Sequence, residues 1–112
     1  MSRRLQKYSQ YLRKLHRASP KVQKKLLKKT NQDTEFVKCL CECARNIIKG
    51  NVKLNGVQRD KIRRRKQSFR KLALKKTPLR EKRRIVQTGG FLGALLGPIV
   101  SILGGLVGSS SS

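Results

Sequence analysis

Charge is distributed very unevenly along this 112-residue chain. The sequence contains 29 lysines and arginines against five acidic residues, a formal net charge of +24 at pH 7. Every basic residue lies at or before Arg84, and residues 85–112 carry no charged side chain. Because like charges repel, a chain of this composition resists compaction unless a polyanion neutralises it. The sequence therefore predicts two regions that prefer different surroundings, a cationic region over residues 1–88 and an uncharged one after it.

Apolar residues recur three and four positions apart throughout the basic region, which indicates helices. No stretch alternates apolar and polar residues for long enough to indicate a strand. Serine, threonine or aspartate before such a stripe marks a helix start, because the side-chain oxygen can accept a backbone N–H. The fold class is therefore all-α, with four to five short helices followed by a hydrophobic, glycine-rich helical segment. The predicted helices cover residues 2–18, 20–29, 33–50, 57–75 and 78–86, with caps at Ser19, at Asp33 or Thr34, and at Thr77.

Three cysteines fall within the cleanest apolar stripe, residues 33–50. Cys39, Cys41 and Cys43 lie two residues apart, so they are poorly placed to form disulfides with one another. Zinc sites usually combine a Cys-x-x-Cys pair with a second, distant pair, which the chain's single histidine, His16, cannot supply. The interpretation is that these are small buried apolar residues in a reducing compartment, and no metal or other cofactor is predicted.

The densest run of cations covers residues 59–84, where more than half of the positions are lysine or arginine. A helix of this composition presents cations on nearly all faces, which suits contact with phosphate backbones, although a solvated helix surface is the alternative. No set of Asn, Gln and Arg side chains marks a base-reading helix, so the predicted binding is non-specific. The predicted contact residues are Arg59, Lys61, Arg63, Arg64, Arg65, Lys66, Arg70, Lys71, Lys75, Lys76, Arg80, Lys82, Arg83 and Arg84.

Little in the sequence suggests catalysis. The five acidic residues are scattered, and His16 stands alone near a predicted helix end. No glycine-rich phosphate loop precedes a helix in the basic region. The few aromatic residues lie mostly on apolar stripes, which disfavours base stacking on single strands. The sequence therefore predicts a binding protein and no enzyme.

The uncharged run, residues 91–108, is 18 residues long, about 27 Å if helical and close to the thickness of a bilayer core. Its glycines and Pro98 are typical of segments that insert obliquely into membranes or permeabilise them. Three interpretations stay open: membrane insertion, docking on a protein partner, and folding back on the core. Residues 109–112 are predicted to form a flexible serine tail. The predicted membrane or docking residues are Phe91, Leu92, Leu95, Leu96, Ile99, Val100, Ile102 and Leu103.

The sequence GGFLGALLGPIVSILGG, which begins at Gly89 and follows an Arg/Lys-rich region, resembles the end of the adenovirus core protein X family (the mu precursor). Counterparts occur in the adenovirus-like Polinton, Maverick and adintovirus elements. The resemblance implies that the basic part condenses viral double-stranded DNA. It also implies that a viral maturation protease cuts after Gly89 and Gly90, although Gln87 stands where that protease favours Met, Ile or Leu. The resemblance covers the last quarter of the chain and the general basicity of the rest.

These observations together predict a viral core or minor virion protein that binds and condenses double-stranded DNA by phosphate neutralisation. The expected location is the virion core, and the host nucleus during infection. The expected partners are double-stranded DNA, a capsid protein or membrane at the C-terminal segment, and the maturation protease. The alternative function is that of a membrane-active cationic protein whose helices hold anionic lipid while the C-terminal segment inserts.

Overall fold

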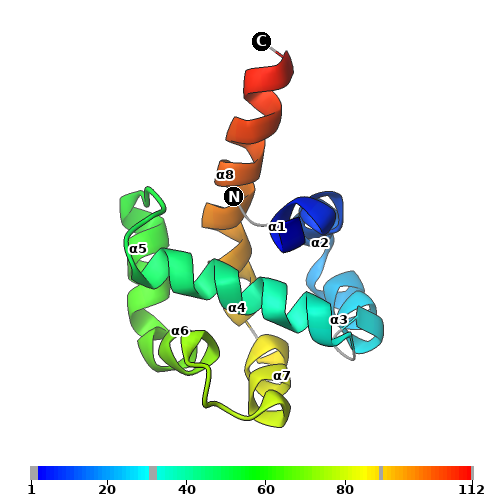
Figure 1. Ribbon diagram of the computed structural model, residues 1–112, viewed down its shortest axis with the longest axis vertical. Coiled ribbons are helices and arrows are strands. Elements are labelled where there is room, and N and C mark those ends of the chain that lie inside the picture. The colour runs from blue at the N-terminus through cyan, green and yellow to red at the C-terminus, as the bar shows by residue number, and fades with distance from the viewer. Residues whose placement is uncertain (1–2, 31–32, 89, 112) are drawn as a thin grey trace.

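The computed structural model describes residues 3–30, 33–88 and 90–111 of the chain. Within these ranges the chain is all-α, as predicted, with eight helices and no strand (Figure 1). The number of helices exceeds the prediction because two predicted helices are each divided in two. In chain order the helices are α1 (Arg3–Lys7), α2 (Ser9–Arg17), α3 (Pro20–Thr30), α4 (Thr34–Ile48), α5 (Gly56–Arg64), α6 (Lys66–Ala73), α7 (Leu79–Gln87) and α8 (Phe91–Ser111).

Two of the predicted helix starts are confirmed in detail. The hydroxyl oxygen of Ser19 lies 3.4 Å from the backbone nitrogen of Val22, and α3 begins at Pro20. Asp33 Oδ1 accepts a hydrogen bond of 3.0 Å from the backbone N–H of Glu35 at the start of α4. In both cases a short polar side chain satisfies a donor in the first helical turn, which otherwise has no partner within the helix.

Two other helix starts differ from the prediction. Thr77 was expected to cap a helix with Pro78 in its first position, but Pro78 is itself the N-cap and α7 begins at Leu79. The backbone of Pro78 is extended, with ψ at 147°, and only its carbonyl joins the helix. The start of α5 carries a capping box that the apolar pattern did not reveal, in which Asn55 and Gln58 each bond the other's backbone N–H.

The two divided helices bend at Tyr8 and at Arg65. Backbone angles leave the helical region there, with φ −99° and ψ 7° at Tyr8 and φ −115° and ψ 28° at Arg65. The reason lies in packing, because α1 contacts α4 while α2 contacts α8, and α5 contacts α8 while α6 contacts α4. Each bend therefore allows one continuous apolar stripe to pack against two different helices.

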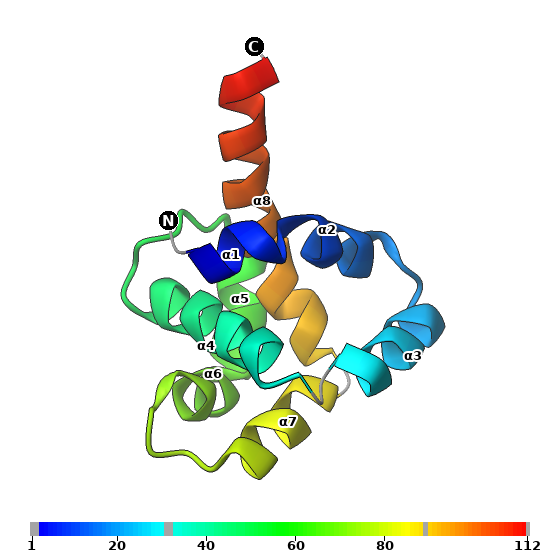
Figure 2. The same ribbon diagram turned by 45° about the vertical axis from the view of Figure 1, so that its right-hand side comes forward.

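The uncharged segment forms α8, whose first half lies at the centre of the core. It contacts α2, α4, α5 and α7, and its C-terminal part extends beyond the other helices (Figures 1 and 2). The segment therefore folds back on the basic helices, one of the three arrangements that the sequence left open, and shares a single core with helices α1 to α7. Six of the predicted membrane or docking residues are buried, with at most 5 % of the side chain exposed: Phe91, Leu92, Leu95, Leu96, Ile99 and Leu103.

The helix α8 continues through Pro98 and ends at Ser111. The flexible tail expected over residues 109–112 stays a prediction. Val100 is half-buried. The side chain of Ile102 and the whole of residue 112 lie outside the part of the chain that the structure describes.

Aromatic side chains join the helices on either side of the core. Tyr8 and Tyr11 both meet the ring of Phe36 edge-on, with ring centroids 5.5 and 5.4 Å apart. Phe69 of α6 packs against Phe91 at the start of α8, with centroids 4.9 Å apart. Such pairs add roughly 0.5–1.5 kcal/mol each beyond the burial of their surface. They therefore hold α4 to the N-terminal helices and α6 to α8.

The three cysteines are buried and free of disulfides, as predicted. A hydrogen bond with Cys39, together with burial, raises the pKa of the Cys43 thiol. Burial also raises the pKa of the Cys41 thiol, against the opposing effect of the nearby Lys82 ammonium. Because thiolates are the nucleophiles and metal ligands, thiols held protonated in this way act as small apolar core residues.

Candidate nucleic-acid interface

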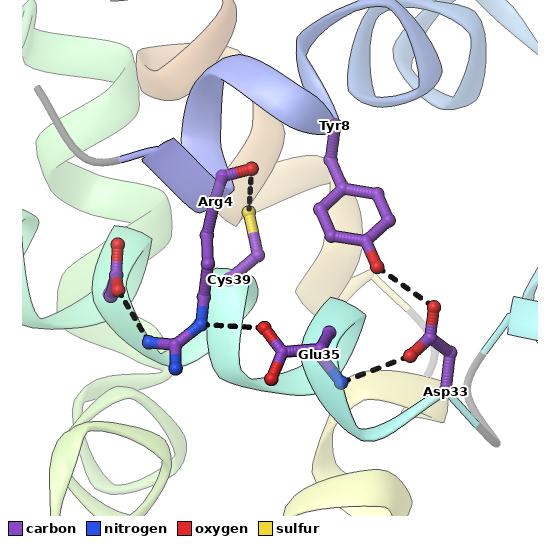
Figure 3. A network of polar contacts seen from close by, with 6 residues as sticks. Arg4, Tyr8, Asp33, Glu35 and Cys39 are labelled. Carbon is purple, nitrogen blue, oxygen red and sulfur yellow. Dashed lines mark hydrogen bonds and ion pairs between the residues drawn. The ribbon is translucent and has the colours of Figure 1, made fainter.

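The acidic residues near the N-terminus are engaged within the fold. Arg4 Nε lies 2.9 Å from Glu35 Oε2, and Arg4 Nη1 lies 2.9 Å from Glu42 Oε1, so one guanidinium bridges two turns of α4 (Figure 3). The backbone carbonyl of Arg4 also accepts a hydrogen bond of 3.7 Å from Cys39 Sγ. Arg4 is therefore a cation that fixes α1 on α4, and it forms ion pairs with two of the chain's five acids.

A second contact between the same helices involves Tyr8, whose hydroxyl donates a hydrogen bond of 2.8 Å to Asp33 Oδ2 (Figure 3). Burial, and then this hydrogen bond, raise the pKa of Tyr8 to about 12 from an ordinary value of 10.0. The same bond lowers the pKa of the Asp33 carboxyl. Asp33 thus both caps α4 and holds the tyrosine at the bend between α1 and α2.

We expect alkaline titration to show a late ionisation of Tyr8 in this chain, which has no tryptophan to obscure tyrosine absorbance. Because the folded pKa of Tyr8 lies above its ordinary value, its contribution to stability is complete below pH 10.0 and is lost as the pH rises toward about 12. Near-ultraviolet absorbance of tyrosinate should show a late transition that Tyr8→Phe abolishes. A Tyr8 that ionises at its ordinary pKa in the folded protein would contradict the hydrogen bond to Asp33.

Most of the basic side chains lie at the surface. All 29 lysines and arginines lie among the described residues, and each is exposed or half-buried. In the described part of the chain, ion pairs join Arg4 to α4 and Lys71 to Glu81, the latter at 3.2 Å. Few acids are therefore left to offset the surface cations, which produces a strongly positive potential around the molecule.

The exposed cations of the predicted run gather in two places. One group lies on α5, whose exposed cations are Arg59, Lys61, Arg63 and Arg64. The other lies on α6, the linker that follows it and α7, at the end of the molecule opposite the C-terminus of α8 (Figures 1 and 2). We call this second group the basic end, and its seven members are Lys66, Arg70, Lys71, Lys75, Lys76, Arg80 and Arg84.

Three residues of the predicted interface have a partly internal position. Arg65, Lys82 and Arg83 are half-buried. Lys82 lies beside the Cys41 thiol, and a side chain on Gly90 would collide with the guanidinium of Arg65. These contacts belong to the packing of α7 and of the turn before α8. Sequence spacing did not separate such residues from the exposed ones, because cations occupy all faces of these helices.

The structure also reveals a cationic groove that the predicted contact list left out. Arg13, Lys14 and Arg17 of α2 line a cavity of about 540 Å³ between α2 and α3. Arg13 additionally donates a hydrogen bond of 2.7 Å to the backbone carbonyl of Leu103 in α8. The sequence signal for this groove was the recurrence of cations at helical spacing in both α2 and α3. The exposed lysines of α3 are Lys21, Lys24, Lys25, Lys28 and Lys29.

The predicted cleavage site lies in the turn between α7 and α8. Gly90 is exposed and adopts φ +83°, a left-handed conformation that favours glycine. Gly89 lies outside the described residues. Phe91, on the other side of the predicted cut, is fully buried. One side of the predicted scissile bond is thus accessible while the other is part of the core.

Over residues 3–30, 33–88 and 90–111, no three His, Cys, Asp or Glu side chains are grouped to hold a metal ion. In the same described portion, no helix combines the length and apolarity needed to cross a bilayer. Comparisons with protein-family models, curated proteins and solved structures found nothing that matches this chain.

Proposed function

We propose that this protein binds double-stranded DNA without sequence preference, by neutralising phosphates with the basic end. The observation that carries the proposal is the concentration of seven exposed cations on one end of a folded chain. Within residues 66–84 the sequence contains a single acid, Glu81, which is paired with Lys71. A surface of this kind attracts a dense line of phosphates, because each contact releases condensed counterions.

The dimensions of the molecule suit a duplex. Its two shorter axes measure 28 and 26 Å, so the basic end would cover about eight base pairs at roughly 3.4 Å per pair. The aromatic residues support duplex rather than single-stranded DNA as the ligand. Phe36, Phe69 and Phe91 are buried, and Tyr8 and Tyr11 are half-buried against Phe36, so they provide no exposed stacking platform.

The proposed biological role is that of a viral core or minor virion protein that condenses packaged DNA, in the virion core and in the nucleus of the host. The resemblance of residues 89–105 to the adenovirus core protein X family supports this role, together with the net charge of +24. The proposal includes no catalysis. Burial of the first half of α8 gives no support to the membrane-active alternative, which would require that helix to leave the core.

Binding to a short duplex at low salt tests the proposal. We expect tight binding to AT-rich and GC-rich duplexes of equal length, with equal affinities. The quadruple variant Lys75→Gln, Lys76→Gln, Arg80→Gln, Arg84→Gln should reduce the dependence of log K on log salt by about four, because each phosphate contact contributes about one. Fluorescence anisotropy of a labelled duplex measures both results.

A matched control removes the same charge elsewhere. The variant Arg3→Gln, Lys38→Gln, Lys49→Gln, Lys53→Gln neutralises four exposed cations outside the basic end. It should keep nearly all of the salt dependence. Equal losses in the two variants would show that net charge, and not the basic end, determines binding. A wild-type protein that ignores duplex DNA at low salt would refute the proposed function.

A further inference from the structure

The end of α4 lies near α5 and α6 (Figure 1). A groove with an apolar floor lies between these helices. Its volume is about 360 Å³, and Ile47, Ile48, Leu54, Ile62 and Phe69 contribute its apolar surface. Ile48 is 46 % exposed although it belongs to the stripe of the core helix α4. Covering the exposed part of such a large aliphatic side chain removes apolar surface from water, which is favourable.

The rim of this groove is entirely cationic. Arg59 and Arg63 of α5 and Lys66 and Arg70 of α6 line it, and all four are exposed. They are spaced by four, three and four residues, so they follow one side of the two helices across the bend at Arg65. None of the residues that line the groove is acidic. The groove thus combines an apolar strip with a parallel row of positive charges.

This combination restricts what can occupy the groove. A second copy of the chain would bring another net charge of +24 against the cationic rim. The printed sequence supplies no acidic segment of its own, since it has five acids and Glu35, Glu42 and Glu81 are already in ion pairs. A duplex phosphate backbone could pair with the rim, but it would leave the apolar floor without a partner.

We propose that this groove binds an acidic amphipathic helix of a partner protein. The apolar residues of such a helix, spaced by three and four positions, would fill the floor around Ile48 and Ile62. Its carboxylates, placed along one flank, would pair with the row from Arg59 to Arg70. The volume of about 360 Å³ matches a few aliphatic anchor side chains, which is how grooves recognise amphipathic helices.

A synthetic peptide tests this inference on the full chain in the absence of DNA. The probe is a 16-residue helical peptide, about four turns long, with leucines at one face and glutamates flanking them. A scrambled peptide of identical composition and charge, without an apolar face, is its control. We expect the first peptide to bind about tenfold more tightly than the second, because only it can cover the floor. Fluorescence anisotropy of labelled peptides gives the two affinities.

Two matched variants locate the contact. Ile48→Asp removes an apolar contact and places a carboxylate at the groove, whereas Val22→Asp makes the same change of charge on α3 at an equal exposure of 46 %. We expect Ile48→Asp to weaken peptide binding about tenfold and Val22→Asp to leave it within about twofold. Circular dichroism confirms that each variant is folded. Equal effects of the two variants, or equal affinity of the two peptides, would overturn the inference.

Isoleucine methyl NMR distinguishes a protein ligand from a nucleic acid. The helical peptide should shift the methyl signals of Ile48 and Ile62 and leave those of Ile85 and Ile99, which are buried in α7 and α8, unchanged. Lys66 and Arg70 belong both to this rim and to the basic end, so a short DNA duplex would contact them, but it should leave the methyl signals of Ile48 and Ile62 on the groove floor largely in place. If the duplex instead shifts them as the peptide does, the groove belongs to the DNA surface and the inference fails, whereas the proposed function stands.

Discussion

Truncation of the chain after Gly90 is expected to unfold the basic helices rather than to release an independent basic domain. Helices α1, α2, α6 and α7 bury only one or two residues each, and α5 buries none. Phe91, Leu95 and Leu96 are fully buried among them. Without α8 the apolar residues of these helices face water, and a shortened chain with net charge +24 loses apolar burial while keeping all of its charge repulsion. Far-ultraviolet circular dichroism should then show loss of cooperative unfolding.

A single substitution in α8 tests how much this helix contributes to the stability of the fold. Leu96→Ala removes a fully buried side chain, and we expect it to lower the free energy of unfolding by about 2–5 kcal/mol. Ser101→Ala, at an exposed position of the same helix, is the control and should change stability by less than about 0.5 kcal/mol. Urea titrations measure both. A truncated chain that keeps its helices and a cooperative transition would show that α8 is dispensable for the fold.

Much of the helical framework could be predicted from local chemistry. Ser19 and Asp33 act as caps because short side chains satisfy the first turn, and the apolar stripe of α4 is buried from Phe36 to Ile47. Most cations of residues 59–84 are exposed for an equally local reason, since few acids are available to pair with them. These features depend on neighbours within one or two helical turns.

The features that sequence reasoning missed depend on contacts between distant segments. The bends at Tyr8 and Arg65 do not interrupt the apolar pattern, and they arise because the two halves of each stripe pack against different helices. The position of α8 is a similar case. An uncharged run is equally compatible with a bilayer, a partner protein or the protein's own core. Which of these surrounds it depends on the apolar surface that the basic helices present.

The candidate sites follow the same division. All seven members of the basic end were in the predicted list, but the sequence did not separate them from the half-buried Arg65, Lys82 and Arg83. The shape of the basic end required the packing of α6 on α7. The groove around Ile48 could not be predicted, because its floor combines residues of α4, α5 and α6. The sequence predicts one helix over residues 57–75, and the bend at Arg65 turns the side that carries Ile62 and Phe69 toward the end of α4.

Salt is expected to stabilise the free protein and to weaken its complex with DNA. The free chain packs 29 cations and five acids into a globule with a radius of gyration of 13.2 Å. Many like charges therefore lie within the screening length at low salt, which is about 30 Å at 0.01 M and about 10 Å at 0.1 M. Raising the salt concentration reduces their repulsion, so the Tm of the free protein should rise.

The complex should respond in the opposite sense, because bound DNA has already neutralised the basic end. Six phosphate contacts, one for each exposed cation of the basic end except Lys71, which is paired with Glu81, give a slope of log K against log salt between about −5 and −6. Between about 50 and 200 mM salt the affinity should fall about 10³- to 10⁴-fold. At low salt, duplex at about 100 times its Kd should add about 2.7 kcal/mol to the free energy of unfolding, and this gain should vanish as salt rises. Thermal unfolding with and without duplex, across salt, measures both trends. A free-protein Tm that falls with salt would show that internal ion pairs outweigh charge repulsion, and a slope much shallower than about −5 would remove the basic end as the phosphate-binding surface.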